Sequence, residues 1–229
     1  MNVKCPHLSQ FPDVKHAFFE AGSAPLSSEK GRAMEAMAGR PLPLVTLNQA
    51  HGTKVLHVTE SEVRDQEGDG LVTDLKEIAL GILTADCGPV LFYDPSTHII
   101  GACHAGWRGA KEGIIQATLK GMEDLGAKRS QIYATLGPTI QQQDYEVGPE
   151  FPDLIGGIYE SYFYSSEKEG HHYFNLPLYI YDLLLKEELA HVHDLKINTF
   201  SGNFASRRRF LTQGKEKVEI HNLSAIAVV

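Results

Sequence analysis

Residues 84–109, which read TADCGPVLFYDPSTHIIGACHAGWRG, determine how the rest of the chain is organised. The pattern predicts two apolar strands joined by a turn within DPST, because turns favour Asp at the first position and Pro at the second. A symmetric turn would pair Tyr93 with His98 and therefore place Cys87 directly opposite His104. Such a pair is either a nucleophile with its base or two ligands of one metal ion. A loop of odd length would shift the register and separate the two side chains.

His51 offers a third soft ligand, because it ends an apolar run and is followed by a glycine. With Cys87 and His104 it would complete three ligands from three different strand ends. Catalytic zinc sites commonly have three protein ligands and one open position, whereas structural zinc fingers use closely spaced pairs. A single buried His or Cys is more often a core residue, so chemistry alone leaves both interpretations open. Cys103 should point away from His104 and is predicted to lie in the core.

The composition is that of a soluble globular protein. Of 229 residues, 42% are hydrophobic and 22% charged, which suffices for a substantial core. No apolar run approaches the ~18 residues of a membrane span, and the N-terminus lacks a signal-peptide pattern. The three cysteines imply no disulfide framework. We therefore expect a cytoplasmic protein with no membrane partner, and the net charge of −8 argues against a nucleic-acid partner.

Strands and helices alternate along the chain with mixed spacing, which indicates an α/β or α+β fold. No internal repeat or linker is visible, so residues 1–229 are predicted to form a single domain. The continuous apolar run at 78–83 is typical of a strand covered on both faces, and it leads directly to Asp86 and Cys87. Asp86 is a candidate for proton transfer or for orienting a ligand, and the alternative is a plain loop-capping aspartate.

After His104 the chain turns through AGWRG into a predicted helix with apolar residues at helical spacing. The ligand would therefore lie just before a helix N-terminus, which is a natural binding site for anions. Gly106 would allow close approach of the backbone, and Arg108 could make a bidentate phosphate contact.

Three motifs in this chain resemble the signatures of a known family, the laccase-domain or multicopper polyphenol oxidase family. They are NQAHG at 48–52, TADCGP at 84–89 and HAGWRG at 104–109. The resemblance covers roughly residues 45–150 well and the rest loosely. It implies layered mixed β-sheets sandwiched by helices. It also implies that His51, Cys87 and His104 bind zinc beside the active site, with Asp69 nearby.

The resemblance further implies a zinc-dependent purine nucleoside enzyme. Such an enzyme would phosphorolyse adenosine, inosine or methylthioadenosine and deaminate adenosine, with a nucleoside and phosphate as its partners, as a monomer or weak homo-oligomer. Asp86, Cys87 and Arg108 would be catalytic. Arg108, Gly106 and Arg208 would contact substrate or phosphate, the last from an Arg-Arg-Arg run that resembles a late family motif. The family's N-terminal Arg and Gly-Gly turn are replaced here by EAGSAP at 20–25.

Three other functions remain open. A copper-dependent phenol oxidase would need many paired histidines, and this chain has one His-x-His motif, at 191–193, which we expect at the end of a helix. A metal-free hydrolase would use Cys87 as nucleophile and His104 as base. A non-catalytic metal-binding module is the third. The H-x-E…P-C-x-x-C pattern of base deaminases does not occur in the sequence.

Overall fold

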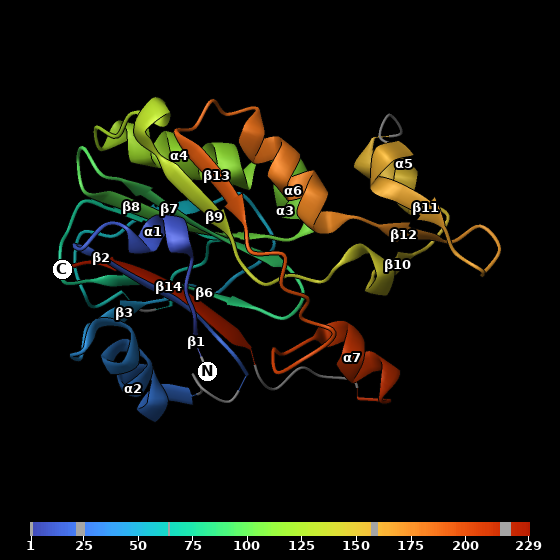
Figure 1. Cartoon of the computed structure of the whole chain (residues 1–229), viewed down its shortest axis with the longest axis horizontal. Helices are drawn as coiled ribbons and strands as arrows, with labels where there is room; N and C mark the ends of the chain where they lie inside the picture. Colours follow the sequence, from blue (N-terminus) through green and yellow to red (C-terminus); the bar gives the residue numbers. More distant parts are fainter. Residues whose placement is uncertain (1, 22–25, 64, 157–159, 216–220) are drawn as a thin grey trace.

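The computed structural model describes residues 2–21, 26–63, 65–156, 160–215 and 221–229. Its main body has four layers, with helices outside and two β-sheets face to face inside (Figure 1). The five-stranded sheet contains, in spatial order, β1 (Asn2–Val3), β2 (Val14–Phe19), β14 (Asn222–Val228), β6 (Ala79–Thr84) and β3 (Leu44–Val45). The six-stranded sheet contains β13 (His191–Asp194), β9 (Tyr133–Leu136), β7 (Gly88–Asp94), β8 (Ile99–Ala105), β5 (Gly70–Thr73) and β4 (Val55–His57).

Helices cover the outer faces of both sheets (Figure 1). The five-stranded sheet packs against α2 (Leu26–Ala38), and the six-stranded sheet against α3 (Trp107–Glu112), α4 (Ile114–Asp124) and α6 (Leu176–Leu185). The short helix α1 (Pro6–Ser9) contacts β2 and β9. A small sheet of β10 (Glu146–Val147), β12 (His172–Phe174) and β11 (Phe163–Ser165) lies at one end with α5 (Phe151–Ile155). The remaining elements are α7 (Arg207–Thr212) and the 3-10 turns η1 (Arg129–Gln131), η2 (Gln142–Asp144) and η3 (Glu160–Tyr162).

Apolar alternation along the strands explains these layers. In β7, Val90 and Phe92 join the core under the helices, whereas Leu91 and Tyr93 join the core between the sheets. Every residue of β7 and β8 is buried because both faces of this sheet are covered. The predicted class of layered mixed sheets between helices is therefore confirmed.

The hairpin register differs from the predicted one by two positions. Tyr93 pairs with Ile100, and Pro89 rather than Cys87 lies opposite His104. The four-residue loop comprises residues 95–98 instead of 94–97, and the Asp94 carboxylate stabilises it by accepting hydrogen bonds from the Ser96 N–H and hydroxyl, at 2.7 and 2.6 Å. A shift of two residues leaves every side chain on the same face of the sheet. The inference that Cys87 and His104 project to one face is therefore unchanged.

Cys103 points into the core under the helices, as predicted. Its thiol lies within hydrogen-bonding distance of the Thr118 side chain. The expected helix after His104 is broken at Gly113, whose φ of 101° separates α3 from α4. The three cysteines are unpaired in this structure. Among the described residues, none of the helices has the length and apolarity that crossing a bilayer requires. Cytoplasmic location, oligomeric state and the lack of a nucleic-acid partner stay predictions.

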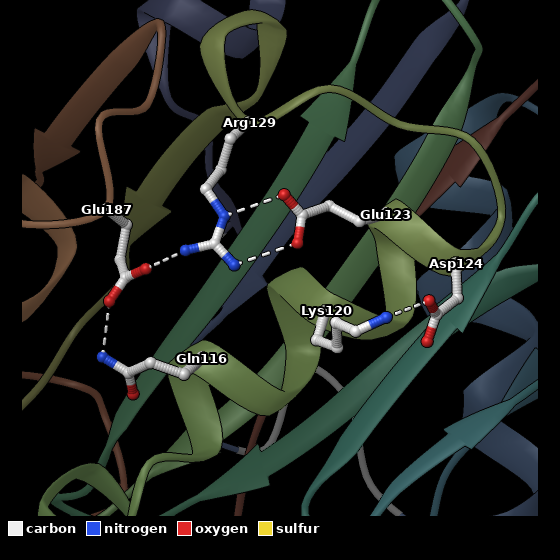
Figure 2. Close-up of polar contacts among 6 residues, drawn as sticks. All are labelled: Gln116, Lys120, Glu123, Asp124, Arg129 and Glu187. Carbon is white, nitrogen blue, oxygen red and sulfur yellow. Dashed lines mark hydrogen bonds and ion pairs between the residues drawn. The ribbon is translucent and has the colours of Figure 1, made fainter.

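An ion-pair network ties α4 to the segment after α6 (Figure 2). Arg129 donates two hydrogen bonds of 3.0 Å to the Glu123 carboxylate and pairs with Glu187 through its other nitrogen. Glu187 also accepts a 2.7 Å hydrogen bond from Gln116. The bidentate geometry and the burial of Glu187 make this network more stabilising than an isolated surface pair.

Buried His16 should make the stability of the fold depend on pH. Its Nε2 accepts the Cys5 N–H at 2.8 Å, and burial, with the nearby Lys4 charge, lowers the pKa of His16 to about 4. Between pH 6.5 and 4 the unfolded chain therefore binds a proton that the folded chain does not, so the free energy of unfolding falls as the pH falls. The amide oxygen of a His16→Gln variant can accept the same bond without titrating.

In urea unfolding, the wild type should lose about 2 kcal/mol more than His16→Gln between pH 7.5 and pH 5. Equal losses in the two proteins would show that His16 is not the group responsible.

Candidate metal centre

Three sequence-distant side chains meet where the chain passes between the two sheets. His51 lies in the loop from β3 to β4, Cys87 in the turn from β6 to β7, and His104 near the end of β8. One ligand atom from each lies within 4.8 Å of the others. The rings of His51 and His104 are 4.6 Å apart in an edge-to-face arrangement. The structure thus brings together the three residues selected from the sequence.

The Asp69 carboxylate organises this cluster and is only 1% exposed. Its Oδ1 accepts hydrogen bonds from His104 Nδ1 at 2.8 Å and from the His51 N–H at 3.0 Å. Its Oδ2 accepts the N–H groups of Ala50 and Gly52, at 3.1 and 2.8 Å. Asp69 therefore fixes Nδ1 of His104 as the protonated nitrogen, which leaves Nε2 for a metal. It also holds His51 in a left-handed conformation, with φ of 61°.

The electrostatics of the cluster favour a charged Cys87–His104 pair. Burial raises the pKa of Cys87, but hydrogen bonds with His104 and His51 outweigh burial and lower this pKa to about 6. Burial lowers the pKa of His104, but Asp69 and Cys87 together raise it to about 9. Burial also raises the pKa of Asp69, yet its hydrogen bonds with His104 and Gly52 hold it below the usual value. Without a metal, both shifts favour a thiolate on Cys87 beside an imidazolium on His104.

Gly106 stands where a side chain would collide with the cluster. A Cβ at this position would lie 3.0 Å from Cys87 Sγ and 3.3 Å from a ring carbon of His51. A Cβ on Gly109 would similarly lie 3.1 Å from the Gly52 carbonyl oxygen. The close backbone approach inferred from the glycines is therefore present. The predicted contact of Gly106 with substrate stays a prediction.

Two cavities adjoin the cluster, with volumes of about 600 and 320 Å³. His51, Cys87 and Arg207 line both of them, so two of the three candidate ligands lie between the two spaces. The larger cavity is completed by polar and basic side chains and a few apolar ones, chiefly Asn48, Gln49, Thr84, His104, Phe210, Lys215 and His221. The smaller cavity is more aromatic and includes Asp86, Trp107, Ile140, Tyr145, Leu176 and Arg208.

Arg108 lies away from both cavities in this structure, unlike the place predicted for it. Its side chain is 61% exposed, and its Nε donates a 2.9 Å hydrogen bond to Glu112 on the same helix. It lines neither cavity. The reason is helical geometry. Trp107 turns inward to the smaller cavity and packs on Phe151, and the next residue is rotated by about 100° toward solvent.

The three consecutive arginines of α7 are used differently. Arg207 lines both cavities. Arg208 lines only the smaller one, where it donates a 2.6 Å hydrogen bond to the Glu146 carbonyl and lies 5.6 Å from the centre of the Tyr145 ring. Arg209 donates to the carbonyls of residues 200 and 202 and so closes the preceding loop. Arg207 and Arg208 therefore both reach a cavity beside the cluster, and the predicted phosphate contact of Arg208 stays a prediction.

Asp86 anchors α7 beside the cluster. Its Oδ1 accepts the Thr199 hydroxyl at 2.6 Å, and its Oδ2 accepts the Arg208 backbone N–H at 2.7 Å. It is held in a left-handed conformation with φ of 90°. These contacts mean that Asp86 stabilises the position of α7. Its proposed part in proton transfer stays a prediction.

Sequence reasoning overlooked several residues that line the larger cavity. Gln49 lies within a motif, and its side-chain amide exchanges hydrogen bonds of 2.7 and 2.8 Å with the backbone of Leu83. Its neighbours Phe210, Lys215 and His221 come from the last twenty residues of the chain. Nothing in their local sequence marks them, because only the placement of α7 and β14 brings them to the cluster.

Comparisons with known proteins agree with this architecture. A family model described as multi-copper polyphenol oxidoreductase laccase matches residues 24–218. A Neisseria meningitidis protein of known structure superposes with a TM-score of 0.79 at 25% identity, covering 100% of this chain and 98% of its own. The Bacillus licheniformis hypothetical protein YfiH gives 0.80 at 23% identity, covering 94% and 93%, and shows the shared fold.

Curated relatives carry the name purine nucleoside phosphorylase. One from Rickettsia prowazekii is 31% identical over 174 residues, which cover 72% of this chain and 70% of that protein. Relatives from Rickettsia conorii and Deinococcus radiodurans are 37% and 40% identical, over 67% and 55% of this chain. The matched parts span 63% and 49% of those two proteins. Since the family model matches most of its length, this chain belongs to the multi-copper polyphenol oxidoreductase laccase family.

Proposed function

We propose that this protein is a zinc-dependent purine nucleoside phosphorylase that also deaminates adenosine. The observation that carries the proposal is the convergence of His51, Cys87 and His104 beside two cavities, both of which are lined by His51, Cys87 and Arg207. The larger cavity has a volume in the range of small-molecule sites. The names of the curated relatives support purine nucleosides as the substrate class.

The chemistry of the donor set fits zinc. Two imidazoles and a thiolate are common zinc ligands, and three protein ligands leave one position open for catalysis. Ligand atoms on tetrahedral zinc are roughly 3.5 Å apart, so small side-chain rotations would close the present cluster on an ion. The hydrogen bond from His104 to Asp69 is the kind of support that metal-bound histidines usually have. When bound, zinc would supply Lewis acidity beside the substrate.

In phosphorolysis, a phosphate oxygen forms a bond to the ribose C1′, and the bond from C1′ to the purine breaks. Arg207 would bind and orient the phosphate, because its side chain lines both cavities and a guanidinium matches phosphate geometry. The aromatic wall of Trp107 and Tyr145 would exclude water from the smaller cavity. Asp69 would keep the imidazole of His104 oriented during the reaction.

Copper is the alternative cofactor, which the family description suggests. A His–His–Cys set can bind copper when a weak axial ligand, often methionine, completes it. Among the described methionines, Met34, Met37 and Met122 all lie in the apolar cores. None of them lines either cavity beside the cluster. This arrangement favours zinc over a blue-copper site.

A metal-free hydrolase is the second alternative, and one observation favours it. The lowered pKa of Cys87 and the raised pKa of His104 describe an activated thiolate. However, such a mechanism has no task for His51, which lies against both partners. The convergence of three potential ligands supports the metal site more directly.

Removing one ligand should release one metal ion. We expect Cys87→Ser to lower the zinc content of untagged protein by about one ion per chain and to abolish phosphorolysis. Cys103→Ala is the matched control, since Cys103 lies in the core, and it should keep its zinc. Elemental analysis measures both. An unchanged zinc content in Cys87→Ser would remove the proposed site, and copper in place of zinc would favour the oxidase.

Replacing Arg207 should weaken the binding of phosphate and leave deamination unaffected. Arg207→Gln removes the guanidinium between the cavities and should raise the KM for phosphate about tenfold or more, because charge-assisted hydrogen bonds to phosphate are lost. Deamination of adenosine uses no phosphate and should be little affected. Arg108→Gln is the control and should change neither reaction, since that side chain points to solvent. Equal losses in both reactions of Arg207→Gln would instead indicate a structural role.

The thiol of Cys87 should titrate near pH 6 in metal-depleted protein. Alkylation by iodoacetamide requires the thiolate, so its rate should be low below pH 6 and reach a plateau above it. Asp69→Asn removes the charge that raises the pKa of His104, and the midpoint should therefore move to higher pH. Bound zinc should protect the thiol. A midpoint near that of an ordinary thiol, at about 8.5, would contradict the charged pair.

A further inference from the structure

A second group of potential ligands lies at the edge of the six-stranded sheet. His7 comes from α1, and His191 and His193 come from β13, the outermost strand of that sheet. The His-x-His motif was expected at the end of a helix, but it lies in this strand. Residues two apart in a strand point to the same face, so both rings face His7. Figure 1 shows α1 beside this part of the sheet.

The three rings are close enough to share an ion. One nitrogen from each lies within 4.8 Å of the others, which is the limit that the His51–Cys87–His104 cluster also meets. The ring centre of His7 is 3.9 Å from that of His191 and 4.7 Å from that of His193. All three side chains are partly exposed, so an ion and its water ligands can reach them.

One atom in this group lacks the partner that its burial demands. The Nε2 of His191 is buried and has no hydrogen-bond partner among the described residues. A buried polar atom without a partner is unfavourable, so an unpaired ring nitrogen on a histidine that lies against two other imidazoles needs an explanation. A metal ion between the rings would provide one.

We propose that His7, His191 and His193 form a second metal site that binds a divalent late first-row transition metal ion, with zinc as the physiological choice. Three neutral imidazoles are donors that suit zinc, copper and nickel, whereas calcium and magnesium require oxygen ligands. The site contains no thiolate, and its three histidines line neither cavity of the candidate active site. It is therefore separate from the cluster around Cys87.

The ion at this site joins two distant parts of the chain. His7 precedes His191 by nearly the whole sequence, and the helix that carries it contacts β9, the neighbour of β13. Binding to the folded state alone stabilises that state by mass action. The site would therefore fix α1 onto the sheet edge and stabilise the fold, without taking part in the nucleoside chemistry.

The test uses Cys87→Ser as the starting protein, so that the first cluster no longer contributes a thiolate. Untagged protein is depleted with a chelator and titrated with zinc in equilibrium dialysis. We expect about one tightly bound ion in Cys87→Ser, with binding weakened about tenfold or more when His7, His191 or His193 is additionally replaced by Gln. His57→Gln in the same background is the control, since His57 is exposed and lies in neither cluster.

Two further measurements distinguish a specific metal site from adventitious metal binding. Saturating zinc should raise the Tm of Cys87→Ser but not that of its His7→Gln derivative. Cobalt bound to Cys87→Ser should show ligand-field absorption without the thiolate-to-metal charge transfer of the wild type. Circular dichroism verifies the fold of each variant, and the three positions on two elements give independent tests.

The proposal is overturned if Cys87→Ser binds no zinc under these conditions. It is equally overturned if His7→Gln leaves both the affinity and the zinc-dependent Tm unchanged, because the ion would then be an adventitious one held by β13 alone.

Discussion

The Asp69 carboxylate is the interaction on which the candidate site depends. A buried anion is unfavourable unless its oxygens are fully hydrogen-bonded, and Asp69 meets this requirement with N–H groups of the very segments that carry His51 and His104. The same bonds determine the loop conformation at His51 and the tautomer of His104. The Cys87 thiolate in turn balances the charge on His104. Removing the Asp69 carboxylate would therefore disturb both the positions of His51 and His104 and the charge of the cluster. Replacing a single ligand would leave the Asp69 hydrogen bonds to the other segments in place.

The sequence contained enough information for the layers and the ligand triad, although not for the hairpin register. Cys87 and His104 were placed on one face by an argument with an incorrect pairing. The conclusion survived because the loop after Asp94 shifts the register by an even number of residues. Arg108 was expected at the site and lies away from it for a related reason. Its proximity in sequence to His104 says nothing about which side of a short helix it occupies, and Trp107 takes the inward side.

Other parts of the site could not be read from local patterns. Arg207, Phe210 and His221 reach the larger cavity because Asp86 anchors α7 and because β14 returns to the centre of its sheet. These are contacts between residues more than a hundred positions apart, and no local propensity encodes them. The run of three arginines does not itself show which ones face the site. The fold places Arg207 at both cavities, Arg208 at the smaller one, and Arg209 in the closure of the preceding loop.

The central place of β14 has a consequence for the order in which the protein can fold during synthesis. This strand follows all the other described strands in sequence, yet it lies between β2 and β6, and these are made much earlier. Until it emerges, both partners expose unpaired strand edges, whereas β7, β8 and β9 can already pair with one another. The six-stranded layer can thus assemble on the ribosome around His104, and the five-stranded layer must wait until β14 has emerged. Nascent chains of this protein therefore carry an aggregation-prone half for most of translation, a stage at which a chaperone would have its greatest effect.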